Sequence, residues 1–429
     1  MRVLVISYFW PPAVRASMHW QFAMVKNFRK FGIEPIVLTV EEETFDTKKD
    51  YTLLEDFPSD IEVIKTKTFE PFNIYRKFNK IEPNRQLVSS ETISKKNKKL
   101  SHRISIWIRM NLFIPDARVG WYFYAVKKMK EYLKKEKVDA ILSVGPPHSS
   151  HLIGLKLAKK YNIPYFPVFE DPWMDIVYYR DFKRSKLTLL IDGYFESEVL
   201  KNATNTIFVT KSMEEDYLKK YPFLQGKSKV LYWGYNESGF TNIKMPEKQE
   251  GEFWIVHTGN IFDYQNPKNF WKTISKKINE GLNIKLKFSG TVSPVIKEEI
   301  HKNGLDDRVE YLGFLNYNEM LGYLLQGDLL LVCPTEKRHV PGKLFEYLRS
   351  GRTIVAFGDD NEEVAKIITD CNAGKLYNYD DTAEDIFERF KDFSTDLIKV
   401  KEFSREKICE NLSKIIETQV KENKFKKQA

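Results

Sequence analysis

The sequence predicts an α/β protein with two domains, each built around a parallel sheet. Short, continuous apolar runs such as Val3–Ile6 and Leu329–Val332 are typical of strands buried on both faces. Segments with helical spacing of apolar residues alternate with these runs, and a polar stretch at Gly234–Gly251 interrupts the alternation. We expect a first domain at residues 1–238, a second at 239–400, and a C-terminal helix at 401–429 that packs back on the first domain.

The composition indicates a folded protein with an excess of positive charge. Of the 429 residues, 42% are hydrophobic, and the formal net charge is +9 with a pI of about 9.0. This excess fits a nucleic acid, an anionic membrane surface or a phosphorylated ligand as partner. A lysine-rich proteome is the alternative explanation.

The three cysteines predict neither a disulfide framework nor a zinc site. Cys333, Cys371 and Cys409 are far apart and show no Cys-x-x-Cys spacing. The N-terminus enters a strand pattern without the features of a signal peptide, and no apolar run reaches the length of a membrane-spanning helix. We therefore expect a cytoplasmic protein.

The first β-α-β unit lacks the fingerprint of a dinucleotide-binding enzyme. The strand at Val3–Ile6 is followed by the loop Ser7–Pro12, a helix containing Met18 and Phe22, and a strand at Pro35–Leu38. No G-x-G-x-x-G occurs between the first strand and the helix, which argues against a Rossmann oxidoreductase. The loop lies at the carboxyl end of its strand, where open parallel sheets bind ligands.

Two basic runs flank an apolar, aromatic stretch. The basic runs are Lys95–Arg103 and Lys127–Lys137, and Ile104–Phe113 lies between them. Basic charge beside exposed aromatics would suit an anionic membrane, at about 1 kcal/mol per cation. A solvated charged helix with its aromatics in the core is the alternative. No nucleic-acid-binding motif is present, so we expect no nucleic-acid partner.

Histidines and carboxylates follow two further strands of the first domain. The strand at Ala140–Val144 ends in a loop with His148 and His151, and the strand at Tyr165–Phe169 ends in Glu170-Asp-Pro-Trp173. This edge of the sheet is where ligands bind, so both histidines are candidate site residues. A structural role for the histidines, and capping of a turn by the carboxylates, are the alternatives.

The second domain carries a lysine and a glutamate one helical turn apart. Lys343 follows the turn Pro341–Gly342 and begins a predicted helix, where free backbone N–H groups and an ammonium would favour an anion. Glu346 shares its face, so the pair could hold the phosphate and the ribose of a nucleotide. Gly259, after the first strand of this domain, would let a ligand approach the backbone closely. A surface ion pair between Lys343 and Glu346 is the alternative.

Several motifs together resemble glycosyltransferase family 4, whose GT-B fold has two Rossmann-like domains facing across a cleft. The motifs occur in the family's order over nearly the whole chain: Leu4–Pro12, Thr258–Asn260, and Val340–Leu348 with Gly351. Phe113–Arg118, Gly145–Gly154 and Glu170–Trp173 are similar to a bacterial branch that works in cell-surface polysaccharide assembly.

The resemblance implies a hexosyltransferase-type enzyme. It would move a sugar from a UDP- or GDP-type nucleotide-sugar, with retention at the anomeric carbon, to a lipid-linked or cell-surface glycan. It would act in the cytoplasm, peripherally at the inner face of the membrane. No two aspartates are separated by a single residue, so the D-x-D metal motif is absent and we expect neither metal nor cofactor.

The same resemblance assigns roles to individual residues. Lys343 would meet the diphosphate and Glu346 the ribose, and the backbone of Gly259 and Asn260 would line the diphosphate. The remaining donor-side candidates are Lys268, Leu344 and Arg338, of which Arg338, with Lys343, would stabilise negative charge on the leaving group. One of the histidines, His148 or His151, would face the transferred sugar. The acceptor-side candidates are Arg15, Glu170, Asp171 and Trp173.

Four positions depart from the family pattern. Arg338 stands where an acid is usual, Val14–Ser17 replaces a glycine pair, Glu170 replaces an arginine, and Asn260 stands where a basic residue is common. These departures leave two alternatives to a glycosyltransferase. One is a sugar-nucleotide epimerase of the same fold, and the other is a non-catalytic subunit that binds sugar-nucleotide or glycan.

Overall fold

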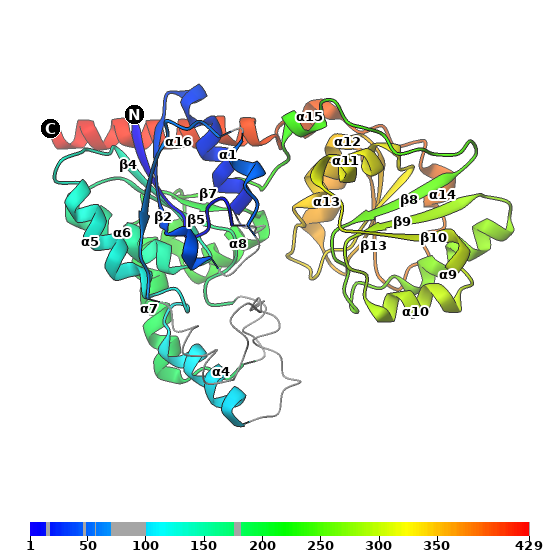
Figure 1. The fold of residues 1–429 in the computed structure, drawn as a ribbon, viewed down its shortest axis with the longest axis horizontal. Coiled ribbons are helices and arrows are strands. Elements are labelled where there is room, and N and C mark those ends of the chain that lie inside the picture. The colour runs from blue at the N-terminus through cyan, green and yellow to red at the C-terminus, as the bar shows by residue number, and fades with distance from the viewer. Residues whose placement is uncertain (14–17, 46–48, 56, 70–99, 176–181, 429) are drawn as a thin grey trace. The chain divides into compact units, whose positions relative to one another are not determined.

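The computed structural model describes residues 1–13, 18–45, 49–55, 57–69, 100–175 and 182–428. The chain forms two compact units (Figure 1). One contains residues 1–231 and 409–429, and the other contains residues 232–408. The division at Leu231–Tyr232 falls before the boundary predicted at residue 238. The last helix, α16 (Arg405–Gln428), belongs to the first unit from Cys409 onward, where the Cys409 Sγ lies 3.5 Å from the Met24 carbonyl oxygen.

The first unit is built on a seven-stranded sheet whose strands all pair in parallel, in the order β3-β2-β1-β4-β5-β6-β7. The strands are β1 (Arg2–Ile6), β2 (Glu34–Val40), β3 (Glu62–Thr66), β4 (Ala140–Gly145), β5 (Tyr165–Phe169), β6 (Thr206–Phe208) and β7 (Ser228–Val230). The helices are α1 (His19–Phe28), α4 (Leu100–Leu112), α5 (Trp121–Tyr132), α6 (Ser149–Tyr161), α7 (Lys186–Asn202) and α8 (Lys211–Lys220). The strand β3 lies in a region where the sequence predicted no element.

The second unit has a six-stranded parallel sheet in the order β10-β9-β8-β11-β12-β13. Its strands are β8 (Phe253–Thr258), β9 (Ile284–Ser289), β10 (Val309–Gly313), β11 (Leu329–Val332), β12 (Thr353–Phe357) and β13 (Gly374–Tyr377). Its helices are α9 (Lys268–Asn279), α10 (Pro294–Lys302), α11 (Tyr317–Gln326), α12 (Lys343–Ser350), α13 (Glu362–Asp370), α14 (Ile386–Arg389) and α15 (Leu397–Lys401).

Both faces of the second sheet are covered, which explains its continuous apolar strands. Along β11, Leu329 and Leu331 belong to one buried cluster, whereas Leu330 and Val332 belong to another. Successive side chains of a strand point to opposite faces, so a strand buried on both sides needs apolar residues at every position.

The strand order creates a switch point in each sheet. In the first sheet β1 pairs with both β2 and β4, and in the second β8 pairs with both β9 and β11. Loops that leave β1 and β4, or β8 and β11, therefore diverge at the carboxyl edge and leave room for a ligand. Most of the residues predicted to form a site lie on these loops or at the helix starts that follow them.

Among the described residues, no helix combines the length and the apolar character that crossing a lipid bilayer requires.

Phe270 tests the packing of the second unit. Its side chain is fully buried and contacts the rings of Trp271, Phe357 and Phe387. Phe270→Ala is expected to lower the free energy of unfolding by about 3–5 kcal/mol, because it removes buried apolar area and leaves a cavity. Phe314 is 94% exposed, so Phe314→Ala should change stability by less than about 0.5 kcal/mol. Urea unfolding followed by circular dichroism measures both, and equal effects would contradict this account of the core.

Candidate functional site

A lysine and a histidine meet at the switch point of the second sheet. Lys343 is the first residue of α12, and its Nζ lies 3.3 Å from Nε2 of His257 on β8. The other ring nitrogen, Nδ1, lies 2.8 Å from the Leu331 carbonyl oxygen of the neighbouring strand. A carbonyl only accepts, so Nδ1 carries the proton and Nε2 accepts from the lysine. The backbone of β11 thus orients the imidazole toward Lys343.

Burial lowers the pKa values of both His257 and Lys343, which favours their neutral forms. Burial, with a smaller contribution from the Lys343 charge, lowers the pKa of His257 well below its ordinary value. Burial lowers the pKa of Lys343 to about 8. Lys343 makes no ion pair with any carboxylate in the part of the chain that the structure describes. The Lys343 ammonium is partly buried, and the imidazole of His257 to which it donates is neutral. An anion would therefore stabilise this ammonium.

Gly259 lies directly beside this ammonium. A Cβ added to Gly259 would stand 2.9 Å from the Lys343 Nζ, and the residue has a φ of +87°, which favours glycine. The preceding Thr258 N–H donates to the Tyr347 hydroxyl of α12 at 2.8 Å, which ties the end of β8 to the same helix. Asn260 is exposed, and its Oδ1 accepts from the Thr291 N–H at 3.1 Å. The structure therefore brings together Gly259, Asn260 and Lys343.

Glu346 faces a different set of partners from Lys343. Its carboxylate is buried, with Oε1 3.7 Å from an Arg405 guanidinium nitrogen and 3.5 Å from the Tyr317 hydroxyl. Burial raises the pKa of Glu346, and the Arg405 charge opposes this shift. The alternative of a surface ion pair between Lys343 and Glu346 is therefore wrong, because both side chains turn to other elements.

The helix start is less open to an anion than the sequence suggested. The Leu344 N–H donates to the Pro341 carbonyl at 2.9 Å, and the Phe345 N–H donates to the Gly342 carbonyl at 3.2 Å. The expectation of free N–H groups fails at these two positions, because the Pro341–Gly342 turn supplies their acceptors. Leu344 is fully buried in the core and serves packing.

Two other donor-side candidates are exposed on loops or helix starts of this unit. Lys268 is the first residue of α9, and Arg338 lies on the loop between β11 and α12. On the same loop, the Thr335 N–H donates to Nδ1 of His339 at 3.0 Å, and burial lowers the pKa of His339 to about 4. This imidazole is therefore neutral, and the positive charge of the loop comes from its lysine and arginine side chains.

In the first unit, the two predicted histidines are buried in an aromatic cluster. His148 stacks on Trp173 with ring centroids 4.8 Å apart, and His151 stacks on Phe169 at 4.7 Å. The His151 Nδ1 lies 2.8 Å from the Ser143 hydroxyl, and a Cβ on Gly145 would stand 2.6 Å from Nε2. His151 has no exposed surface, which makes it a packing residue, whereas His148 is 4% exposed. Burial lowers the pKa of His148 to about 3 and that of His151 well below its ordinary value, so both rings are neutral.

The acceptor-side candidates that follow β5 are largely buried, whereas residues that bind an acceptor at the surface would be exposed. Glu170 is 6% exposed, and neither of its carboxyl oxygens has a hydrogen-bond partner among the described residues. Burial, helped by the nearby Asp171, raises the pKa of Glu170 well above its ordinary value. Asp171 is half-buried, and burial raises its pKa to about 6. Trp173 is fully buried, and its Nε1 donates to the Asp192 carboxylate at 2.7 Å. Arg15 lies outside the described residues.

The sequence analysis missed four residues that shape these sites. They are His257, Tyr317, Arg405 and Asp116. Asp116 accepts hydrogen bonds from the Ser149 N–H at 2.9 Å and the Ser149 hydroxyl at 2.6 Å, so it caps the start of α6 beside His148. The sequence pattern around His257 could have identified it, since it is a polar residue at the end of an apolar strand. No local pattern identifies Tyr317 or Arg405, because their partner Glu346 is distant from both in the sequence.

No group of three or more His, Cys, Asp or Glu side chains is placed to hold a metal ion within the described ranges.

Part of the second unit resembles a known family. Residues 252–396 match the family described as glycosyl transferases group 1. The matched residues include His257, Gly259, Lys343 and Glu346, so the Lys343 site lies within the matched segment.

One curated relative resembles part of the chain. It is Protein CapJ of Staphylococcus aureus, 28% identical over 187 residues, which are 42% of this chain. The match spans 44% of the length of CapJ, so less than half of that protein is represented.

Solved structures resemble nearly the whole chain in fold. HepE from Anabaena in complex with UDP has a TM-score of 0.63 at 13% identity and covers 97% of this chain and 100% of its own. Sucrose-phosphate synthase from Thermosynechococcus elongatus has a TM-score of 0.60 at 14% identity, covering 97% and 98%. A glycosyltransferase from Rickettsia africae has a TM-score of 0.60 at 16% identity, covering 98% of each chain. The prediction of a GT-B fold with two Rossmann-like domains is confirmed.

Lys343 is expected to titrate with a pKa of about 8, because burial disfavours its charged form. Competitive amine labelling over a pH series, read by mass spectrometry, measures this value directly in the ligand-free protein. The exposed Lys268 provides a reference for reagent access. A midpoint at the ordinary lysine value of about 10.4 would contradict the burial of this ammonium.

Glu170→Gln is expected to stabilise the protein increasingly as pH rises. The folded state keeps Glu170 protonated above the ordinary glutamate pKa, whereas the unfolded chain ionises there, so wild-type stability falls as pH rises toward the raised pKa. The loss amounts to about 1.4 kcal/mol for each pH unit between the two pKa values. Glutamine stays neutral and avoids the loss.

Urea unfolding of the wild type and E170Q over a pH series measures this difference. Glu131→Gln, at an exposed position of α5, is the matched control, and its pH profile should run parallel to that of the wild type because it retains Glu170. Parallel pH profiles for the wild type and E170Q would mean that Glu170 is ionised in the folded protein.

Proposed function

We propose that this protein is a retaining glycosyltransferase of family 4 and of the branch that assembles bacterial cell-surface polysaccharide. It transfers a hexose from a UDP- or GDP-type nucleotide-sugar to a lipid-linked or cell-surface glycan. It works without metal, in the cytoplasm, peripherally at the inner face of the membrane. The proposal rests on one observation above all. Lys343 is a partly buried ammonium at the switch point of the sheet in the group 1 domain, and it has no carboxylate partner among the residues that the structure describes.

The donor would bind with its diphosphate beside Lys343 and Gly259. The absence of a side chain at Gly259 would let a phosphate oxygen reach the ammonium, because an added Cβ would stand 2.9 Å from Nζ. Structures of HepE from Anabaena contain UDP and UDP-glucose, which supports a uridine nucleotide as the first donor to test. The Glu346 carboxylate, held near Arg405 and Tyr317, would accept hydrogen bonds from the ribose hydroxyls.

The charge of Lys343 suits the chemistry of transfer. When the bond between the anomeric carbon and the diphosphate breaks, negative charge grows on the leaving oxygen. A fixed cation stabilises this charge more in the transition state than in the ground state, and so raises the rate. Arg338 and Lys268 would add positive charge on the same unit. His257 keeps the Lys343 side chain in place, since its neutral Nε2 accepts a hydrogen bond from the ammonium.

Retention is consistent with attack from the face that the diphosphate leaves. The acceptor hydroxyl forms the new bond to the anomeric carbon as the old bond breaks, and its proton passes to an oxygen of the leaving phosphate. This path needs no enzymatic nucleophile. His148 is the better histidine to contact the sugar, because His151 is fully buried and bonded to Ser143. A neutral His148 would orient the sugar by hydrogen bonding rather than act as an acid.

Lys343→Ala and Glu346→Ala are each expected to reduce sugar transfer at least about tenfold, which corresponds to about 1.4 kcal/mol of lost transition-state stabilisation. The measurement is transfer from radiolabelled UDP- and GDP-sugars to membrane glycolipid extracts, with and without EDTA. Transfer should persist in EDTA, and the product should keep the anomeric configuration of the donor. Lys366→Ala, an exposed lysine of α13, is the control for charge removal.

Four results would contradict parts of this proposal. Near-wild-type transfer in both site variants would exclude the Lys343–Glu346 assignment, and loss of transfer in EDTA would exclude metal independence. Free UDP with an altered sugar, formed without an acceptor, would identify an epimerase. Nucleotide-sugar binding without turnover across all donors and acceptors would identify a non-catalytic binding subunit.

A further inference from the structure

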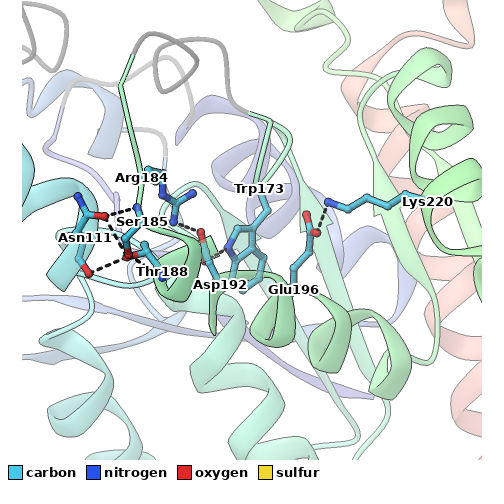
Figure 2. Close-up of polar contacts among 8 residues, drawn as sticks. All are labelled: Asn111, Trp173, Arg184, Ser185, Thr188, Asp192, Glu196 and Lys220. Atoms are coloured by element: carbon cyan, nitrogen blue, oxygen red, sulfur yellow. Dashed lines mark hydrogen bonds and ion pairs between the residues drawn. The ribbon is translucent and has the colours of Figure 1, made fainter. Parts of the chain in front are cut away.

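Helix α7 of the first unit directs its polar side chains inward. Thr188, Asp192 and Glu196 follow one another at intervals of four residues and are buried. Figure 2 shows how the two carboxylates are satisfied: Asp192 accepts from Trp173 Nε1 and pairs with Arg184, and Glu196 pairs with Lys220 Nζ at 2.7 Å. The Tyr217 hydroxyl also donates to Glu196 at 2.7 Å.

The opposite side of α7 is apolar and exposed. Leu187, Leu190 and Tyr194 are 67%, 71% and 62% exposed, and Leu189 and Ile191 are exposed beside them. A surface helix of a protein in water normally buries its apolar side and exposes its polar side. Around Leu187–Tyr194, α7 instead exposes apolar residues and buries polar ones. The buried hydrogen bonds of Asp192 and Glu196 hold the helix in this orientation.

Helix α4 lies against the start of α7. The Asn111 Oδ1 accepts from the Ser185 N–H at 2.7 Å and from the Thr188 hydroxyl at 3.1 Å (Figure 2). Around this contact α4 exposes Trp107 at 55% and Leu112 at 63%, together with Ile104 and Ile108. We call the exposed apolar residues of these two helices the α4–α7 apolar face. Exposed apolar side chains in this number on two adjoining helices indicate an interaction site.

The charges around this face identify the kind of partner. Helix α4 contains no acidic residue; of the three carboxylates of α7, Asp192 and Glu196 are buried and Glu198 pairs with Lys159. Lys183 and Lys186 are exposed at the start of α7. An apolar surface with positive charge at its edge is complementary to the interface of an anionic phospholipid bilayer, where acyl chains receive the apolar side chains and phosphates receive the ammonium groups.

We propose that the α4–α7 apolar face docks the first unit on an anionic phospholipid bilayer, with Trp107, Leu187 and Leu190 in the interfacial layer and Lys183 and Lys186 among the headgroups. The docking deepens the proposed function, because it names the surface by which the enzyme reaches a lipid-linked acceptor, but the binding itself does not require transferase activity. The stretch Ile104–Phe113, predicted from the sequence to lie at such a surface, forms part of α4 as far as Leu112, and the structure adds α7 to it. Of the two predicted basic runs, the side chains of Lys95–Arg103 lie outside the described residues.

Vesicle flotation tests this surface. The full-length protein should bind vesicles of phosphatidylglycerol with phosphatidylcholine more tightly than vesicles of phosphatidylcholine alone. Trp107→Glu and Leu190→Glu should each weaken binding at least about tenfold. Phe314→Glu, which places the same charge at an exposed apolar position of the second unit, should bind like the wild type. Thermal unfolding of each variant checks that both substitutions leave the fold intact.

Tryptophan fluorescence gives an independent readout. Six of the eight tryptophans are fully buried, and Trp107 is 55% exposed. Brominated lipids should therefore quench Trp107, and Trp107→Phe should remove most of this quenching while vesicle binding persists.

The docking surface and the proposed function can fail separately. If the wild type does not bind anionic vesicles, the docking proposal is overturned even if sugar transfer is intact. The same holds if Trp107→Glu and Leu190→Glu bind the vesicles as tightly as the wild type does. A wild-type dimer that these variants convert to a monomer, with no vesicle binding, overturns it in favour of contact between two copies. Loss of sugar transfer across all donors, with vesicle binding retained, would instead contradict the proposed function alone.

Discussion

Parallel pairing of β8 with β11 is the constraint on which the candidate donor site depends. It places the Leu331 carbonyl where it can hold His257 Nδ1, and the other ring nitrogen then meets Lys343 at the start of the next helix. The same constraint operates in the first unit, where the pairing of β4 with β1 and β5 sets the positions of His148 and Glu170. At each edge, the backbone groups of the neighbouring strands determine which hydrogen bonds these side chains can form.

The two edges differ in charge although both are rich in titratable groups. In the first unit, burial keeps His148, His151 and Glu170 in their neutral forms. In the second, neutral His257 lies beside the Lys343 ammonium, which has no carboxylate partner within the described part of the chain. Neutral groups that form hydrogen bonds suit the hydroxyl groups of a sugar, and a cation suits a diphosphate. This difference is the reason why we propose the second unit for the donor diphosphate.

The fold could be predicted from the sequence because the strands are continuous apolar runs, and the start of α12 at Lys343 follows from the Pro341–Gly342 turn. The strand β3 was missed because its alternating exposure gives only a weak pattern. Lys343 and Gly259 were found because their motif is local. The Arg405–Glu346 contact and the cap of α6 by Asp116 could not be found, since each joins residues far apart in sequence. Burial of His151 and Trp173 also depends on packing that no short motif encodes.

The lowered pKa of Lys343 affects how many protons are taken up when a ligand binds. At a pH above about 8, the free protein holds this amine largely uncharged. An anion that binds beside it favours the charged form, so the complex must take up a proton from solution. The apparent affinity for any such anion then declines as the solution becomes more alkaline, and the heat of binding includes the ionisation heat of the buffer. Anion binding beside Lys343 would thus be coupled to the uptake of a proton.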